Sequence, residues 1–104
     1  MTEQTPAAAD ALSAPTREAL ELWIRELVHH LEVEGLQVDV ESVVRISDYA
    51  DSTVVDPAGP VTTFLIGYVA GLAEASGQAD FATCHRAATR VAERLLNRRR
   101  AAVG

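Results

Sequence analysis

Apolar residues recur with a helical period along this chain, and that pattern limits its fold more than any other feature. In the first clear stretch they fall at the i, i+3, i+4 and i+7 positions that mark one face of an α-helix: Leu20, Trp23, Ile24, Leu27, Val28 and Leu31. Glu21 and Arg25, four residues apart on the other side, are in the favourable order for a helical ion pair. A helix over about residues 16–34 is therefore predicted, with Gly35 as its stop.

Three further helices are predicted from capping residues and apolar stripes. Asp39 is a good N-cap for a helix over about residues 40–50, and Pro60 suits the first position of the next one. Asp80 caps a last helix that runs to about Arg99. Because the connections are short, neighbouring helices are expected to be antiparallel. The predicted fold class is all-α, a compact up-and-down bundle of about four helices.

The third of these helices, residues 60–75, is apolar almost all round. Such a helix is typically covered on several sides, and we expect this one to be the central helix of the bundle. Gly67 and Gly71 are four residues apart on one of its faces. Each costs about 1 kcal/mol of helix stability relative to alanine, so close packing against a neighbouring backbone is the expected compensation.

The length of 104 residues fits one domain. Residues 1–14 lack an apolar period and are predicted to form a flexible N-terminal tail. Residues 15–100 are expected to form the helical bundle domain, and residues 101–104 are expected to fray at the C-terminus.

Charge is unevenly distributed along the chain. The net charge is −6, but residues 1–59 hold twelve acids and three arginines, whereas residues 60–104 hold three acids and six arginines. A net acidic chain is a poor general binder of nucleic acid, because phosphate contacts supply most non-specific affinity.

The longest uncharged stretch, residues 57–73, is too short and too broken at its start for a membrane span. With the single cysteine Cys84, the chain suits a reducing compartment. We expect a cytoplasmic protein that binds neither nucleic acid nor membrane.

The chain contains two adjacent pairs of metal-type side chains, His29-His30 and Cys84-His85. Consecutive helical residues diverge by about 100°, so neither pair converges on one ion, and the spacing fits no structural zinc motif. Cys84 is interpreted as a small packed side chain rather than a nucleophile, since adjacent helical side chains point apart. We predict no metal, no cofactor and no catalytic residue, and an enzyme is the least favoured class.

Five residues are candidates for binding a ligand or a partner. Thr62 and Thr63 open the third helix, where free backbone N–H groups favour an anion; ordinary capping by these hydroxyls is the alternative. Arg86, Arg90 and Arg94 form a stripe opposite the apolar face of the last helix. That stripe is either a solvated helix face or a docking surface for an acidic protein or a phosphate group, which the guanidinium fork suits.

One segment resembles a known family. Residues 56–71 read DPAGPVTTFLIGYVAG, which is similar to the Pro-Ala-x-Pro-Leu-Thr-Thr-aromatic-Leu-x-Gly-x-x-x-Gly core of a small actinobacterial domain of unknown function. The Leu20 to Trp23 spacing and the acidic start of the second helix at Asp39 extend the resemblance over about residues 18–96. Family members often carry the label of molybdopterin-guanine dinucleotide biosynthesis, so the resemblance implies an actinobacterial source and a link to molybdenum-cofactor biosynthesis. The chain departs from the family pattern at residues 47–55.

The leading functional hypothesis is a non-catalytic helical accessory or protein-interaction domain, linked by the resemblance to molybdenum-cofactor biosynthesis. Its protein partner would dock on the face formed by Arg86, Arg90 and Arg94. The alternative is a small protein that binds a phosphate or another small-molecule ligand through Thr62, Thr63 and nearby arginines. A homodimer is left open, built either on the exposed side of the third helix or by close approach at its two glycines.

Overall fold

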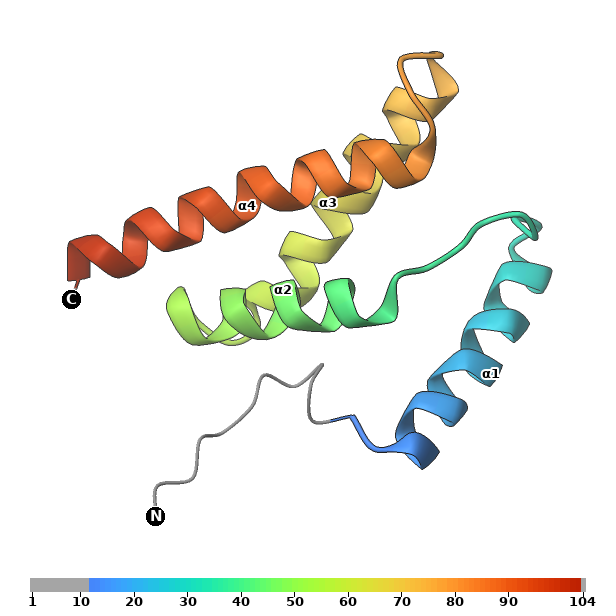
Figure 1. Ribbon diagram of the computed structural model, residues 1–104, viewed down its shortest axis with the longest axis horizontal. Coiled ribbons are helices and arrows are strands. Elements are labelled where there is room, and N and C mark those ends of the chain that lie inside the picture. Colours follow the sequence, from blue (N-terminus) through green and yellow to red (C-terminus); the bar gives the residue numbers. More distant parts are fainter. Residues whose placement is uncertain (1–11, 104) are drawn as a thin grey trace.

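The computed structural model describes residues 12–103, which form four α-helices (Figure 1). The helices are α1 (Ala14–His30), α2 (Val40–Thr53), α3 (Ala58–Ala75) and α4 (Phe81–Val103). Within this range there is no β-strand. The prediction of an all-α fold with four helices is confirmed. Most of the predicted N-terminal tail, residues 1–11, lies outside the described residues.

The caps predicted from the sequence are present. The Asp39 carboxylate accepts a hydrogen bond from the backbone N–H of Ser42 (3.2 Å), and the Asp80 carboxylate accepts one from Thr83 (2.8 Å). The first helix ends earlier than predicted: Leu31 is its C-cap, and Glu32 takes the left-handed φ of 61° that was expected at Gly35.

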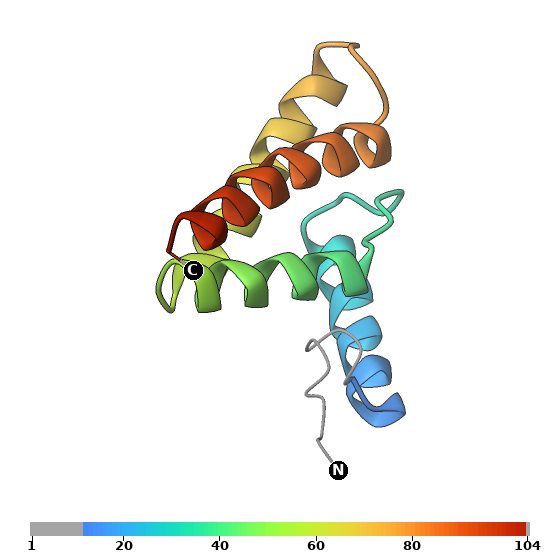
Figure 2. The same ribbon diagram turned by 60° about the vertical axis from the view of Figure 1, so that its left-hand side comes forward.

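Helices α2, α3 and α4 pack around a small common core. Figures 1 and 2 show α2 and α4 running in the same general direction, with α3 crossing them on the way back. The buried apolar side chains come from all three helices: Ile46, Ala50, Ile66, Ala70 and Leu96. Half-buried residues complete the core, namely Tyr49, Ala58, Ala88 and Ala92. Because most of these side chains are small, the helices approach closely and enclose little apolar volume.

Helix α1 lies beyond the start of α2 in Figure 1, and in both views it lies apart from α3 and α4 (Figures 1 and 2). No other helix of the described chain packs against it. Residues 31–39 connect it to α2, and an ion pair between Arg17 and Glu41 ties its first turn to the first turn of α2. Its apolar stripe is therefore open to solvent, with Trp23 53% and Leu31 65% exposed.

Helix α3 is covered on one side only, which corrects the prediction of a central helix covered on several sides. Ile66 and Ala70 face the core, but large apolar residues on the opposite side are between 51% and 69% exposed: Val61, Phe64, Leu65, Tyr68, Val69 and Leu72. The reason is the position of α1, because the helix that would complete the bundle does not reach this side. We call these six residues the outer α3 face.

Glycine makes a close helix contact at Gly59 rather than at the two positions predicted. A Cβ at Gly67 or Gly71 would have no neighbouring atom within 4 Å, so the expected close packing at that pair is absent within the described chain. A Cβ at Gly59 would instead lie 2.5 Å from the carbonyl oxygen of Ser47. The contact between the start of α3 and the middle of α2 therefore requires a residue without a side chain.

Candidate functional site

The two candidate threonines use their hydroxyl groups inside their own helix. Thr62 Oγ1 donates to the carbonyl oxygen of Ala58 (2.8 Å), and Thr63 Oγ1 donates to that of Pro60 (3.0 Å). Such i to i−3 and i−4 bonds are common for threonine in helices. In this arrangement neither hydroxyl is directed to a ligand.

The N-terminus of α3 already receives an acidic group from the same chain. Asp51 of α2 accepts a hydrogen bond from the backbone N–H of Gly59 at 2.6 Å. A carboxylate at this end of a helix satisfies a free N–H group and interacts favourably with the helix dipole. Asp51 therefore takes the place that an anionic ligand of α3 would need. Sequence reasoning missed it, because Asp51 lies eight residues before Gly59 and in another helix.

The three candidate arginines are exposed on successive turns of α4. Arg86 makes a long hydrogen bond from Nη2 to Thr83 Oγ1 (3.4 Å). Across residues 12–103, the ion pairs within 4 Å are Arg17 with Glu41 and His29 with Glu34. No carboxylate of the described chain is therefore within ion-pair distance of Arg86, Arg90 or Arg94, and these three guanidinium groups are available to a partner.

The histidines and the cysteine do not assemble into a site. His29 Nδ1 lies 2.8 Å from Glu34 Oε2 in an exposed local pair, and its ring contacts His30 edge to face. The His85 ring contacts the Phe81 ring in a tilted arrangement, with centroids 5.6 Å apart, and Cys84 is half-buried beside it. In the part of the chain that the structure describes, no group of three or more His, Cys, Asp or Glu side chains is placed to hold a metal ion.

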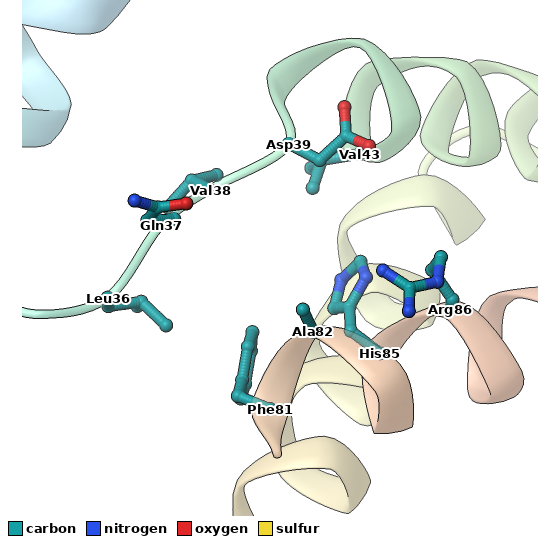
Figure 3. Close-up of a pocket in the computed structure, with 9 residues that line it drawn as sticks. All are labelled: Leu36, Gln37, Val38, Asp39, Val43, Phe81, Ala82, His85 and Arg86. Atoms are coloured by element: carbon teal, nitrogen blue, oxygen red, sulfur yellow. The ribbon is translucent and has the colours of Figure 1, made fainter.

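A small hollow lies between the segment before α2 and the start of α4 (Figure 3). Its volume is about 120 Å³, whereas pockets for drug-sized ligands are roughly 300–1,000 Å³. Figure 3 shows Leu36 and Phe81 facing each other across it, with His85 and Arg86 side by side on α4. The space suits a few water molecules or one small side chain rather than a nucleotide or a pterin.

The most extensive surface feature is apolar. Each residue of the outer α3 face is more than half exposed. This leaves on the order of 100 Å² per residue open to solvent, more for Phe64 and Tyr68 than for the aliphatic residues, since aromatic side chains can bury roughly 150–250 Å². Six such residues reach the upper end of the roughly 300–600 Å² that is usual for the largest apolar patch of a monomer. Val91 and Leu95 of α4, both about half exposed, add to the apolar area. The extent of this surface was not predicted, because an apolar helix is normally interpreted as one covered on several sides; the sequence only left open a dimer on an exposed side of this helix.

Together these features define a small helical domain whose described part offers exposed surfaces for contact, the small hollow, and a wider open one of about 820 Å³ beside residues 32–37 and the start of α4. The chain belongs to the family described as domain of unknown function DUF6457, whose model matches residues 15–103. The predicted resemblance to a family of domains of unknown function is confirmed at that level. No curated protein and no solved structure matches the chain significantly. None of the described helices has the length and apolar character needed to span a membrane.

Proposed function

We propose that this chain is a non-catalytic helical accessory domain that docks on an acidic surface of a partner protein. The observation that carries the proposal is the exposed row of Arg86, Arg90 and Arg94, none of which has a carboxylate of the described chain within 4 Å. Guanidinium groups form bidentate hydrogen bonds with carboxylates and are more weakly hydrated than ammonium groups, which lowers the cost of pairing them. A row of three therefore favours an acidic partner over a neutral one.

The spacing of the row indicates what such a partner looks like. Residues four apart on a helix are separated by about 6 Å along its axis, so the row from Arg86 to Arg94 is about 12 Å long. Acidic side chains on successive turns of a partner helix have the same separation. We therefore expect Asp or Glu residues spaced four apart on the partner.

The sequence resemblance supports a more specific form of this proposal. Residues 56–71 are similar to a family segment whose members are often labelled for molybdopterin-guanine dinucleotide biosynthesis. In this form the partner is an enzyme of molybdenum-cofactor biosynthesis, such as a guanylyltransferase, in the cytoplasm of an actinobacterium. Direct titration of the purified enzyme with this chain tests whether that enzyme is the partner, independently of which face of the chain it binds.

The ligand-binding alternative has less support. The hydroxyls of Thr62 and Thr63 donate to their own helix, and Asp51 occupies the N-terminus of α3. Thermal denaturation with inorganic phosphate, guanine nucleotides and a pterin compares the two functions, because a ligand of the folded state raises the melting temperature. A rise that depends on ligand concentration and is lost in Thr62→Ala would favour the alternative.

The docking proposal is tested with a charge-matched pair of triple variants. Affinity capture of the tagged chain in its own cells identifies a partner, whose binding is then measured by calorimetry with both proteins purified. Changing Arg86, Arg90 and Arg94 to Glu should weaken binding at least tenfold. The control changes the exposed residues Arg25, Arg45 and Arg98 to Glu, which alters the net charge equally and should have a much smaller effect. Equal losses of affinity in both variants, or unchanged affinity in both, would contradict the proposed docking face.

A further inference from the structure

We propose that the outer α3 face is covered by a second copy of this chain, with α1 of each copy packed on α3 of the other. This inference goes beyond the proposed function, because it concerns a different face and a different partner. It joins two apolar surfaces that are present in every chain but do not meet within one chain.

The first of these surfaces is the stripe of α1. Trp23, Leu27 and Leu31 lie on one face and are at least 36% exposed. In proteins most of the stability of a helix comes from packing of its apolar face rather than from the helix propensity of its residues. The structure nevertheless holds α1 as a continuous helix with no helix of the described chain against it. A covering surface is therefore needed.

The second surface is the outer α3 face together with its flank on α4. Leu95 lies two residues before Asn97, so these side chains diverge by about 160° around the helix. Asn97 accepts a hydrogen bond from Tyr49 of α2, which fixes the side of α4 that faces α2. Val91 and Leu95 consequently lie on the flank away from α2. The outer α3 face and this flank offer an apolar surface for a helix to lie on.

Charge at the borders of the two surfaces is complementary. Glu21 and Glu26 border the α1 stripe on its two sides, whereas Arg94 and Arg98 border Val91 and Leu95 on α4 by the same helical geometry. All four charged residues belong to helices, and no ion pair within 4 Å involves any of them across the described residues. A helix α1 that lies on α3 beside α4 brings acidic groups toward basic ones.

The area is sufficient for a stable dimer. About ten exposed apolar side chains, six on α3 and four on or next to α1, amount to roughly 1,000 Å² per chain at the value of about 100 Å² each. A standard protein interface buries about 800 Å² per partner. A two-fold exchange of α1 covers both surfaces of both copies with one type of contact, as closed symmetric dimers do.

A second copy is favoured over the same chain by the position of α1. The ion pair of Arg17 with Glu41 holds the first turn of α1 at the start of α2, and both views show α1 and α3 apart. With this anchor kept, the stripe of α1 is presented to another molecule. The exchange needs no rearrangement of the three-helix unit.

The mass in solution is the first test. Light scattering should give twice the chain mass of 11.1 kDa. Leu65→Glu on α3 and Leu27→Glu on α1 should each give the monomer mass, with the helical circular dichroism of α2 to α4 retained. Leu22→Glu is the matched control, because Leu22 is 59% exposed but lies on the polar side of α1, and this variant should remain a dimer. A monomer mass for the unaltered chain at high micromolar concentration would overturn the proposal.

Cross-linking identifies the two helices in contact even where a variant fails to fold. In a Cys84→Ser background, a chain with Leu27→Cys is mixed with a differently tagged chain with Leu65→Cys and treated with a short bis-maleimide. A mixed product of both tags is expected. The proposal fails if Leu65→Cys links only to itself, or if a chain with both cysteines links within itself. Arg86 and Arg90 changed to Glu, with Arg94 kept because it borders the dimer surface, should weaken docking of the acidic partner but keep the dimer mass, so the dimer and the proposed docking face are judged separately.

Discussion

The carboxylate of Asp51 and the backbone N–H of Gly59 lie 2.6 Å apart and join the end of α2 to the beginning of α3. The N-cap residue of α3, Pro57, offers no side-chain hydrogen bond, so the capping group comes from the preceding helix. The same contact brings Gly59 against Ser47. Position 59 thus combines a capped N–H group with a helix crossing that leaves no room for a Cβ.

Substitution of Gly59 should be costly for that reason. In Gly59→Ala the added methyl group meets the carbonyl oxygen of Ser47 at 2.5 Å, so α2 and α3 must separate, at a cost of about 1–3 kcal/mol in unfolding free energy. Urea denaturation measures this loss of unfolding free energy. Gly67→Ala is the control, because its Cβ has open space and the helix should gain up to about 1 kcal/mol. Similar losses in both variants would contradict this explanation.

Removal of the Asp51 carboxylate should weaken α3 at its start. Asp51→Ala leaves the N–H of Gly59 without its acceptor, and loss of an N-cap acceptor costs about 1 kcal/mol. Asp51→Asn keeps an oxygen acceptor and should lose less. Thermal denaturation should give melting temperatures that fall from the parent to Asp51→Asn and then to Asp51→Ala. An alanine variant as stable as the parent would show that the bond contributes nothing.

The Tyr49 hydroxyl links α2 to α4 by donating to Asn97 Oδ1 at 2.5 Å. Tyr49→Phe should lower the unfolding free energy by about 1 kcal/mol, the usual net value of one hydrogen bond. The ring remains 5.6 Å from the Arg100 guanidinium carbon, so that contact is kept. A double-mutant cycle with Asn97→Ala isolates the pair, and a coupling energy near zero would contradict the expected contribution.

Asp80 makes stability depend on acid pH. Thr83 lowers the pKa of this carboxyl below its ordinary value of 3.8, first through its backbone N–H and then through its side chain, with a smaller contribution from the charge of Arg86. A depressed pKa in the folded state adds stability above the unfolded value, and that stability is lost as the pH falls through the folded pKa. The urea midpoint of the parent should therefore fall more between pH 5 and pH 2 than that of Asp80→Asn. Parallel pH profiles would exclude a role for Asp80.

Trp23 offers an optical measure of association, since it is the chain's one tryptophan. Its side chain is 53% exposed in the single chain and becomes buried when α1 lies on a second copy. Its emission should shift to longer wavelength as the protein is diluted through dissociation. The control Leu22→Glu should show the same shift, whereas Leu65→Glu should emit at the longer wavelength throughout. Emission that does not change with concentration would argue against burial between chains.

Local signals predicted the helices well. Asp39 and Asp80 cap the helices that they precede in the sequence, because the acceptor and the N–H group are three residues apart. The end of α1 was harder to place, since Glu32 takes the left-handed conformation that glycine usually takes. The helix end is closed by local hydrogen bonds from the backbone N–H groups of Glu32 and Val33 to the carbonyl oxygens of His29 and Val28.

Contacts between helices were not predictable from the same signals. The cap of α3 comes from Asp51 in another helix, and the close contact occurs at Gly59 instead of Gly67 and Gly71. An apolar stripe also does not show whether the same chain or another molecule covers it. The exposure of Phe64 and Tyr68 could therefore be determined only from the arrangement of whole helices. The arginine row on α4 was placed correctly on an exposed face, because polar residues opposite an apolar stripe face solvent.

The small core of α2, α3 and α4 has a consequence for how this sequence can drift during evolution. Three large aliphatic side chains, Ile46, Ile66 and Leu96, share the interior with alanines. Truncation of one large core side chain typically costs about 2–5 kcal/mol, out of a total stability of about 5–15 kcal/mol. Relatives that lose one of the three should carry a compensating enlargement at a neighbouring alanine, such as Ala88 or Ala92. Natural variation should therefore be paired at these positions and independent on the solvated side of α4.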